Sequence, residues 1–357
     1  MDHPNVAERR IVVNHVRDPR YECRHFTQAE ELLQAVAPVP ALDTKTSNPA
    51  FIFRGQPLAS WNLVPSAFRT DKGDLPGRAP CSCPPPTKPT QPPKSEAIIL
   101  VAPYRFEGTA DEQVFAEFLL LKMFIEMCDR AIIPLPGDSY EFRQAWMDDQ
   151  RSAVQSAYRD PAIWPQPQYL PLLAFAQHHG VPTRLLDWTR NPVVAAYFAA
   201  ADHVNNYKEG DLAIWALNIE FLHLYPLIEL LSMPGANSQR LGAQRGLFTL
   251  VRPKTTRGVP LELDRLTLVD ALINANENPS KPKPLWKLTL PHSEALRLLY
   301  VCHLNGIDAA SVYPGPTGAA IATLDRLAWL RVDPATGLNA VTARLLSPSN
   351  VTSQRTQ

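Results

Sequence analysis

The stretch QHHGVPTRLLDWTRNPVVAAYFAAA, residues 177–201 of the 357-residue chain, is the most informative part of the sequence. Asn191 is a favourable N-cap residue and Pro192 a favourable first residue of a helix, so a helix is expected to begin there. The unpaired N–H groups of such a helix end attract anions. Because Arg184 precedes this end and Asp187 adds a carboxylate, the stretch predicts a site for a phosphate or pyrophosphate group.

The same polar residues also fit a purely structural role. Asp187 would then pair with Arg184 or Arg190, as buried arginine–carboxylate pairs do, and Trp188 would fill the core. On this interpretation the stretch stabilises the fold and binds no ligand.

Two adjacent histidines in this stretch suggest further chemistries. His178 would act as a base, with Asp187 as its orienting carboxylate, in a nuclease or nucleotide hydrolase. Metal binding is not expected, because His178 and His179 would point to different sides of a helix and no third ligand follows at a metal-binding spacing. The motifs of serine hydrolases, zinc proteases, P-loop proteins and Rossmann folds do not occur in the sequence.

The composition is that of a globular protein with long connections. Hydrophobic residues make up 45% and charged residues 20%, which excludes wholesale disorder, and 36 prolines predict frequent interruption of helices and strands. The 35 basic residues balance 35 acidic ones, so no overall field draws the chain to nucleic acid or membranes. Because five cysteines form no disulfide framework and residues 192–201 are too short to span a membrane, a cytoplasmic protein without membrane contact is expected.

The segments before this stretch predict an N-terminal extension, a strand and an insert. A helix and a strand are expected within residues 1–45. The run Ala50 to Phe53 predicts a buried strand that ends at Arg54-Gly55-Gln56, where glycine permits a sharp exit and leaves two polar side chains at the strand tip. Residues 72–95 are rich in proline and predict an extended loop.

A helical layer is expected over residues 105–180. It includes a helix that Thr109 and Glu112 would begin as a capping box, a helix from Asp138 towards Tyr158, and a helix that ends before Gly180. Later strands are expected at Leu212 to Leu217, Gly246 to Val251 and Trp286 to Leu290, with helices at Ser293 to Asn305 and Ala319 to Trp329. This order indicates an α+β fold, followed by a polar tail over residues 336–357.

Four blocks of the sequence resemble the FRG domain family, which is named for a Phe-Arg-Gly tripeptide. The blocks are Phe53-Arg54-Gly55-Gln56 with Trp61, Leu63, Pro65 and Phe68-Arg69; AQHHGVPTRLLDWTRNPVVAAYFA at 176–199; AQRGLFTL at 243–250; and GIDAASVYPGPTGAA at 306–320, with Tyr313 at an expected aromatic position. The resemblance implies an FRG domain over residues 46–335, with residues 72–95 as an insertion.

The FRG resemblance further suggests an ADP-ribosyltransferase-like fold. Its split β-sheet core would carry the helical layer between the first and second core motifs. In such enzymes an arginine or histidine on the first strand contacts NAD, a second strand with Ser or Thr leads into a helix of small residues, and a Glu or Gln begins a later strand. Arg54 fits the first position, Thr183 to Thr189 the second and Gln244 the third. Gln244 can bind a ribose hydroxyl but cannot supply the charge of the more common Glu, which Asp187 would then provide.

The resemblance therefore implies an NAD-dependent ADP-ribosyltransferase, or an NAD glycohydrolase if water is the acceptor. Arg54, Asp187 and Gln244 are its expected catalytic residues, and NAD is the expected substrate. The pyrophosphate is expected near Arg54, Arg184 and the N-terminus of the Pro192 helix. The residues expected to bind NAD are Gln56, His178, Thr183, Arg184, Trp188, Thr189 and Tyr197, with the nicotinamide against Trp188 or Tyr197.

The expected partners are NAD and a macromolecular acceptor, either protein or nucleic acid. By family analogy the biological context is that of a toxin or an anti-phage defence effector. A different class of function also fits the resemblance: a degenerate transferase fold that binds a nucleotide or nucleic acid without chemistry, which Gln in place of Glu favours.

Overall fold

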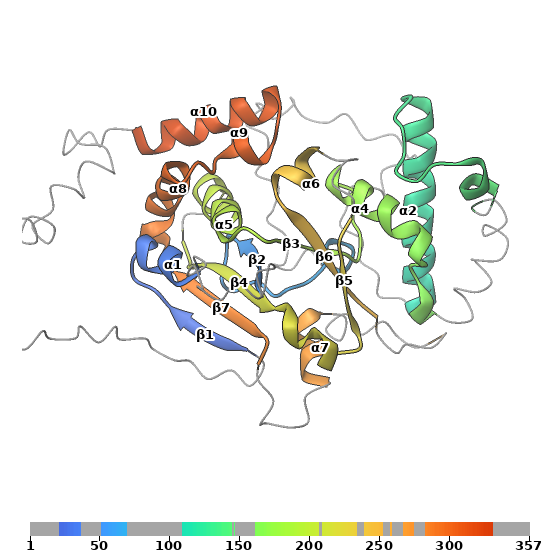
Figure 1. Ribbon diagram of the computed structural model, residues 1–357, viewed down its shortest axis with the longest axis horizontal. Coiled ribbons are helices and arrows are strands. Elements are labelled where there is room, and N and C mark those ends of the chain that lie inside the picture. The colour runs from blue at the N-terminus through green and yellow to red at the C-terminus, as the bar shows by residue number, and fades with distance from the viewer. Residues whose placement is uncertain are drawn as a thin grey trace, which may run out of the picture.

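A mixed seven-stranded sheet lies at the centre of the computed structural model, in the order β1-β7-β4-β2-β3-β6-β5 (Figure 1). The strands are β1 Glu22–His25, β2 Phe51–Gln56, β3 Leu186–Thr189, β4 Leu212–Asn218, β5 Ile228–Leu231, β6 Gly246–Val251 and β7 Leu285–Leu290. Neighbouring strands are antiparallel except β1 and β7, which are parallel. The expected α+β class is confirmed.

The structure describes residues 21–36, 51–69, 109–144, 146, 161–206, 209–233, 239–252, 258, 267–274 and 283–330. The expected proline-rich insert at 72–95, the polar tail at 336–357 and most of the helix expected from Asp138 towards Tyr158 lie outside these residues. Among the helices described, none combines the length and the apolar composition that a membrane span needs.

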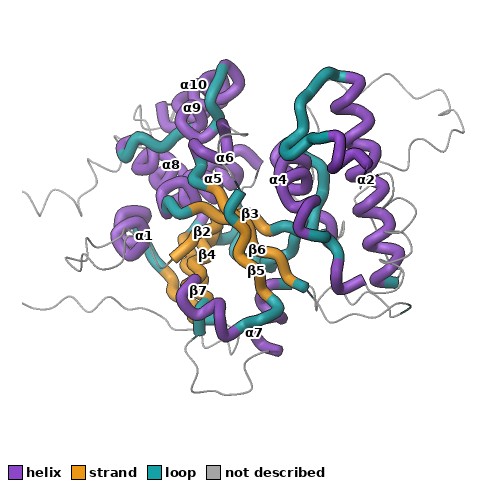
Figure 2. Tube along the Cα trace, turned by 45° about the vertical axis from the view of Figure 1, so that its right-hand side comes forward, coloured by secondary structure: helices purple, strands orange, loops and turns teal. Residues whose placement is uncertain are grey.

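One face of the sheet is covered by five helices that pack on one another (Figures 1 and 2). They are α1 (Ala29–Val36), α5 (Pro192–Asn206), α8 (Ala295–Leu304), α9 (Ala309–Val312) and α10 (Pro316–Leu330). Leu212, Ile214 and Ala216 alternate along β4 and point into this layer, as the period of two along a strand requires. The opposite face packs Trp215 and Leu217 against α7 (Leu268–Asn274).

A second group of helices follows β2 in the chain and returns to β3. It contains α2 (Ala110–Arg130) and α4 (Leu170–His178), which Figure 2 shows beside the β6–β5 end of the sheet. The predicted capping box is confirmed: the N–H of Thr109 donates to Glu112 Oε2 at 2.7 Å. These helices bury a core of their own against Phe248 and Leu250 of β6.

Strand β2 does not end where the sequence suggested. It continues through Gln56, so Arg54 lies within the strand, and Gly55 makes no sharp exit. The reason is packing. A Cβ atom on Gly55 would lie 1.9 Å from the carbonyl oxygen of Ala195, which means that α5 rests directly on the strand. The small residues of α5 and Gly55 thus permit a close approach between helix and sheet.

The sheet is continuous, but very few residues pair between β2 and β3. These two strands share one pair of facing residues, Phe53 and Thr189, whereas β2 and β4 pair over six. Arg54 and Asp187 come just beyond that pair, on the side where the strands separate. The separation makes room for side chains between the two halves of the sheet.

Candidate functional site

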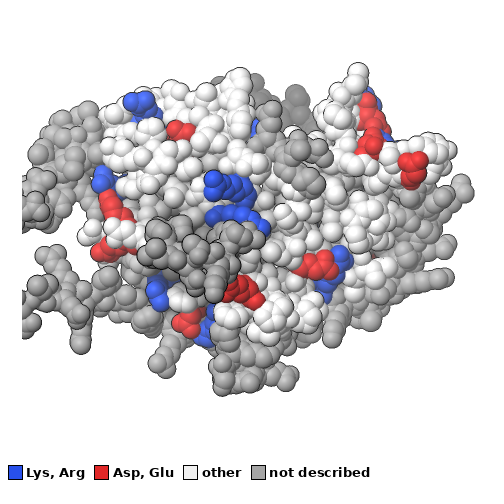
Figure 3. Space-filling view, in the orientation of Figure 1, with Lys and Arg blue, Asp and Glu red and all other residues white. Residues whose placement is uncertain are grey.

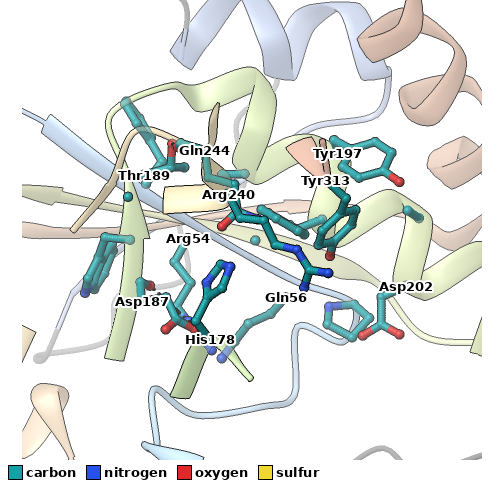
Figure 4. Close-up of a pocket in the computed structure, with 18 of the residues that line it drawn as sticks. Arg54, Gln56, His178, Asp187, Thr189, Tyr197, Asp202, Arg240, Gln244 and Tyr313 are labelled. Atoms are coloured by element: carbon teal, nitrogen blue, oxygen red, sulfur yellow. Dashed lines mark hydrogen bonds and ion pairs between the residues drawn. The ribbon is translucent and has the colours of Figure 1, made fainter. Parts of the chain in front are cut away.

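A pocket of about 550 Å³ opens where β2 and β3 separate. Its walls come from β2, the end of α4, β3, α5, the helix α6 (Gln239–Ala243) and the loop at Tyr313. The volume falls in the range of roughly 300–1,000 Å³ typical of small-molecule sites. The structure brings Arg54, Asp187 and Gln244 together in the lining of this one pocket (Figure 4).

The carboxylate of Asp187 is fixed by two donors. Nη1 of Arg54 lies 3.0 Å from Asp187 Oδ2 and 2.9 Å from its backbone oxygen, and Gln177 Nε2 donates to Oδ1. Gln177 is itself oriented by the hydroxyl of Thr183, which donates to its Oε1. The side chain of Asp187 nevertheless remains 56% exposed, so an anchored negative charge faces the pocket.

Asp187 therefore pairs with neither arginine of its own segment. Arg184 instead forms a buried ion pair with Glu117 of α2, with Nε 2.7 Å from Glu117 Oε2, and it is absent from the pocket lining. Thr183 is also buried outside the lining, and its contribution is to orient Gln177. The purely structural interpretation of this stretch correctly predicted a buried arginine–carboxylate pair. The carboxylate of that pair, however, is Glu117 and not Asp187.

Two polar atoms at the pocket are buried without a hydrogen-bond partner in the described part of the chain: Nε of Arg54 and Nε2 of His178. Burial holds the pKa of His178 below its ordinary value of about 6.5, and the charges of His179 and Arg240 lower it further. His178 is therefore neutral at pH 7. Orphaned polar atoms that line a cavity are what a polar ligand would satisfy.

The expected base–carboxylate pair of a nuclease is not formed. Both oxygens of Asp187 bind Arg54 and Gln177, and among the described contacts no hydrogen bond joins Asp187 to His178. Nor do three His, Cys, Asp or Glu side chains of the described residues gather as metal ligands would.

Gln244 sits at the entry to β6, beside β3. Its backbone oxygen accepts a hydrogen bond from Thr189 Oγ1 at 2.6 Å, and its Nε2 donates to the carbonyl of Val312 at 3.1 Å. The amide is thereby oriented, with Oε1 as the end that no described residue binds. Thr189 belongs to the lining, but its hydroxyl is occupied by this structural bond.

Three other expected ligand-binding residues line the pocket while their polar atoms serve the fold. Gln56 accepts from Trp215 Nε1 at 2.7 Å and donates to the carbonyl of Asn62. Trp188 Nε1 donates to Thr249, and the hydroxyl of Tyr197 donates to Asp325 at 2.8 Å. All three are almost fully buried. They shape the lining, to which the rings of Trp188 and Tyr197 contribute apolar surface.

The N-terminus of α5 is capped as predicted but does not reach the pocket. Asn191 Oδ1 accepts the N–H of Val193 at 3.0 Å, and the lining of the pocket begins later in the helix, at Ala195. Of the groups expected at the pyrophosphate, the structure therefore brings Arg54 to the pocket but not Arg184 or this helix end, because the Arg184 guanidinium is committed to Glu117 and the helix end lies outside the cavity.

Sequence reasoning missed three charged residues of the lining: Arg69, Asp202 and Arg240. Asp202 lies on the predicted helix that begins at Pro192, four residues after Phe198, which also lines the pocket. Arg240 lies on α6, a helix that the sequence did not predict. Figure 3 shows Lys and Arg side chains gathered at the centre of this face, over the region between α5 and α6.

Replacing Asp202 by Asn is expected to stabilise the protein at neutral pH. Burial raises the pKa of Asp202 above its ordinary value of about 3.8, a shift that a hydrogen bond from Asn206 only partly offsets. The folded chain thus keeps a proton that the unfolded chain releases, so the stabilising contribution is full below about pH 3.8 and is lost as the pH rises through the folded-state pKa.

Calorimetry should give Asp202→Asn a higher melting temperature than wild type at pH 7 and an equal one near pH 4. Exposed Glu220→Gln is the control, and an equal melting temperature at both pH values would contradict the prediction.

Comparison with known proteins identifies one region of the chain. Searches of curated proteins and of solved structures find no match. Residues 132–208, which include the whole of α4, β3 and α5, match the FRG domain family. The chain therefore contains an FRG domain, matched over residues 132–208.

Proposed function

We propose that the pocket binds NAD and that the chain cleaves its nicotinamide–ribose bond, as an ADP-ribosyltransferase or an NAD glycohydrolase. One observation carries the proposal: segments far apart in sequence bring an arginine, an anchored carboxylate and an oriented amide into the lining of one cavity of about 550 Å³. Two polar atoms there, Arg54 Nε and His178 Nε2, have no hydrogen-bond partner in the described ranges of the chain, and a polar ligand would supply one.

The chemistry requires negative charge beside the ribose. When the bond between C1′ and the nicotinamide nitrogen breaks, the bonding electrons leave with nicotinamide and positive charge develops on the ribose. The Asp187 carboxylate would stabilise that charge from a position already fixed by Arg54 and Gln177, so little reorganisation is required. Oε1 of Gln244 would accept a hydrogen bond from a ribose hydroxyl. With water as acceptor, its oxygen attacks C1′, a proton passes to solvent, and ADP-ribose results.

The proposal includes an ADP-ribosyltransferase-like arrangement of the core. Arg54 on β2, the β3–α5 unit and Gln244 before β6 would be its three motifs, and the helices between β2 and β3 its insertion. A macromolecular acceptor would approach through the exposed side of Asp187. A toxin or anti-phage effector is the biological role that this chemistry would serve.

Replacing Asp187 by Asn is expected to lower NAD turnover about a hundredfold, because the amide keeps the shape but loses the charge that stabilises the oxocarbenium-like state. Nicotinamide release from NAD, followed by chromatography with and without cell lysate as a source of acceptor, measures the effect. Glu126→Gln on the exposed side of α2 is the control, since its only described ion pair is with Lys122 at 3.9 Å.

Three outcomes separate the candidates. Nicotinamide release that depends on added lysate supports a transferase, and nicotinamide release in buffer alone supports a glycohydrolase. Tight NAD binding without release by the wild type would favour the non-catalytic nucleotide-binding function, for which Gln244 in place of Glu already argues. A folded Asp187→Asn protein with wild-type turnover would contradict the role given to Asp187.

A further inference from the structure

Arg240 is the pocket cation least committed to the fold. It lies on α6, with its guanidinium 5.7 Å from the centre of the Tyr313 ring. Within the described chain no carboxylate lies within 4.0 Å of it, whereas Arg54 pairs with Asp187. A guanidinium that is held against a ring and faces a cavity is suited to bind a phosphate through its fork of N–H groups.

His178 lies on the same side of the pocket. Its Nε2 is buried and has no hydrogen-bond partner among the residues that the structure describes, and the charge of Arg240 is close enough to contribute to the lowered pKa of the ring. Figure 4 shows the Arg240 side chain between His178 and Tyr313. An anion bound here would accept hydrogen bonds from the Arg240 guanidinium and from Nε2 of a neutral His178 in the tautomer that carries its proton there.

We infer that the diphosphate of the ligand binds between Arg240 and His178, with Arg54 Nε as a third donor, a position that rests on the proposed NAD-binding function. The charges of the lining suit it, because three arginines (Arg54, Arg69 and Arg240) face two carboxylates (Asp187 and Asp202).

This position of the diphosphate also determines where the two nucleosides of the ligand lie. A diphosphate in the middle of the pocket puts one ribose on the Asp187 side and the other nucleoside on the Tyr313 and Asp202 side, which Figure 4 shows across Arg240. Phe198, Ala201 and Ile321 provide apolar surface there, as a base would require. The ligand class is therefore a nucleoside diphosphate or a dinucleotide rather than a nucleoside.

The test is calorimetric titration of the full chain with ADP and with NAD. Arg240→Gln is expected to weaken the binding of both about tenfold to a hundredfold, the range for loss of charge-assisted hydrogen bonds. Arg240→Lys keeps the charge without the fork and is expected to lose less, and it serves if the Gln variant fails to fold. Arg130→Gln, on the exposed end of α2, is the matched control.

The outcomes distinguish this inference from the proposed function. If both Arg240 variants bind ADP and NAD as tightly as wild type, the diphosphate position is wrong while NAD binding stands. If wild type binds ADP in an Arg240-dependent way but neither binds nor cleaves NAD, the diphosphate site stands and the NAD proposal fails. If wild type binds neither compound, both fail.

Discussion

Replacing Glu117 by Gln is expected to lower the free energy of unfolding by about 3–5 kcal/mol, because it leaves the charge of Arg184 buried without a counter-ion. Four N–H groups converge on the Glu117 carboxylate: Nε and Nη2 of Arg184 at 2.7 and 2.9 Å, Trp164 Nε1 at 3.0 Å and Gln113 Nε2 at 2.8 Å. An amide in this place would turn an N–H towards Arg184 and Trp164 Nε1, which donate and cannot accept. Urea unfolding measures the loss.

The control lies on the same helix. Glu126→Gln removes an exposed i,i+4 pair with Lys122 and should cost only about 0.2–0.5 kcal/mol. A double variant, Glu117→Leu with Arg184→Met, removes both charges and should recover part of the loss, as apolar replacement of buried ion pairs often does. The recovery is partial because Trp164 Nε1 and Gln113 Nε2 still lose their acceptor. If Glu117→Gln costs no more than Glu126→Gln, the buried pair does not anchor the α2–α4 helices to β3.

Replacing Gly55 by Ala is expected to destabilise the protein by about 3 kcal/mol or more, the upper end for overpacking. The new methyl group would lie 1.9 Å from the oxygen of Ala195 and 2.8 Å from the nitrogen of Ala199. Both are backbone atoms of α5 and cannot rotate away, so the helix would have to lift from β2. Thermal unfolding should show a large fall in melting temperature.

A second glycine separates crowding from backbone strain. Gly137 has a φ of +72°, and no described atom lies within 4 Å of the place that a methyl group would take, so Gly137→Ala should cost only the left-handed conformation, about 1–2 kcal/mol. Equal losses for the two variants would mean that contact with α5 is not what requires glycine at position 55.

Local signals predicted the elements that carry their own caps and periods. The N-cap at Asn191, the capping box at Thr109 and the bounds of β6 are confirmed, because each depends on residues within a few positions of one another. Strand β5 and helices α6 and α7 are short, at four to seven residues, and depend on pairing or packing with distant segments, so they left little pattern in the sequence.

The sequence predicted which residues line the site better than it predicted their hydrogen-bond and ion-pair partners. Arg54, Asp187 and Gln244 came from a family resemblance and do line one pocket. Arg184 was misassigned because its partner, Glu117, lies 67 positions away. Polar character alone does not show which of two arginines faces solvent or ligand, since that depends on tertiary contacts.

The range matched by the family model is too short to define a protein fragment that keeps the site. The Asp187 carboxylate would survive in a fragment of residues 132–208, but its arginine clamp on β2, the amide before β6 and the aromatic wall at Tyr313 would all be cut away. The carbonyl of Val312 that orients Gln244 would go with them. Such a fragment would keep the segment that identifies the family but would lack most of the walls of the pocket, so activity should be assayed with the whole chain.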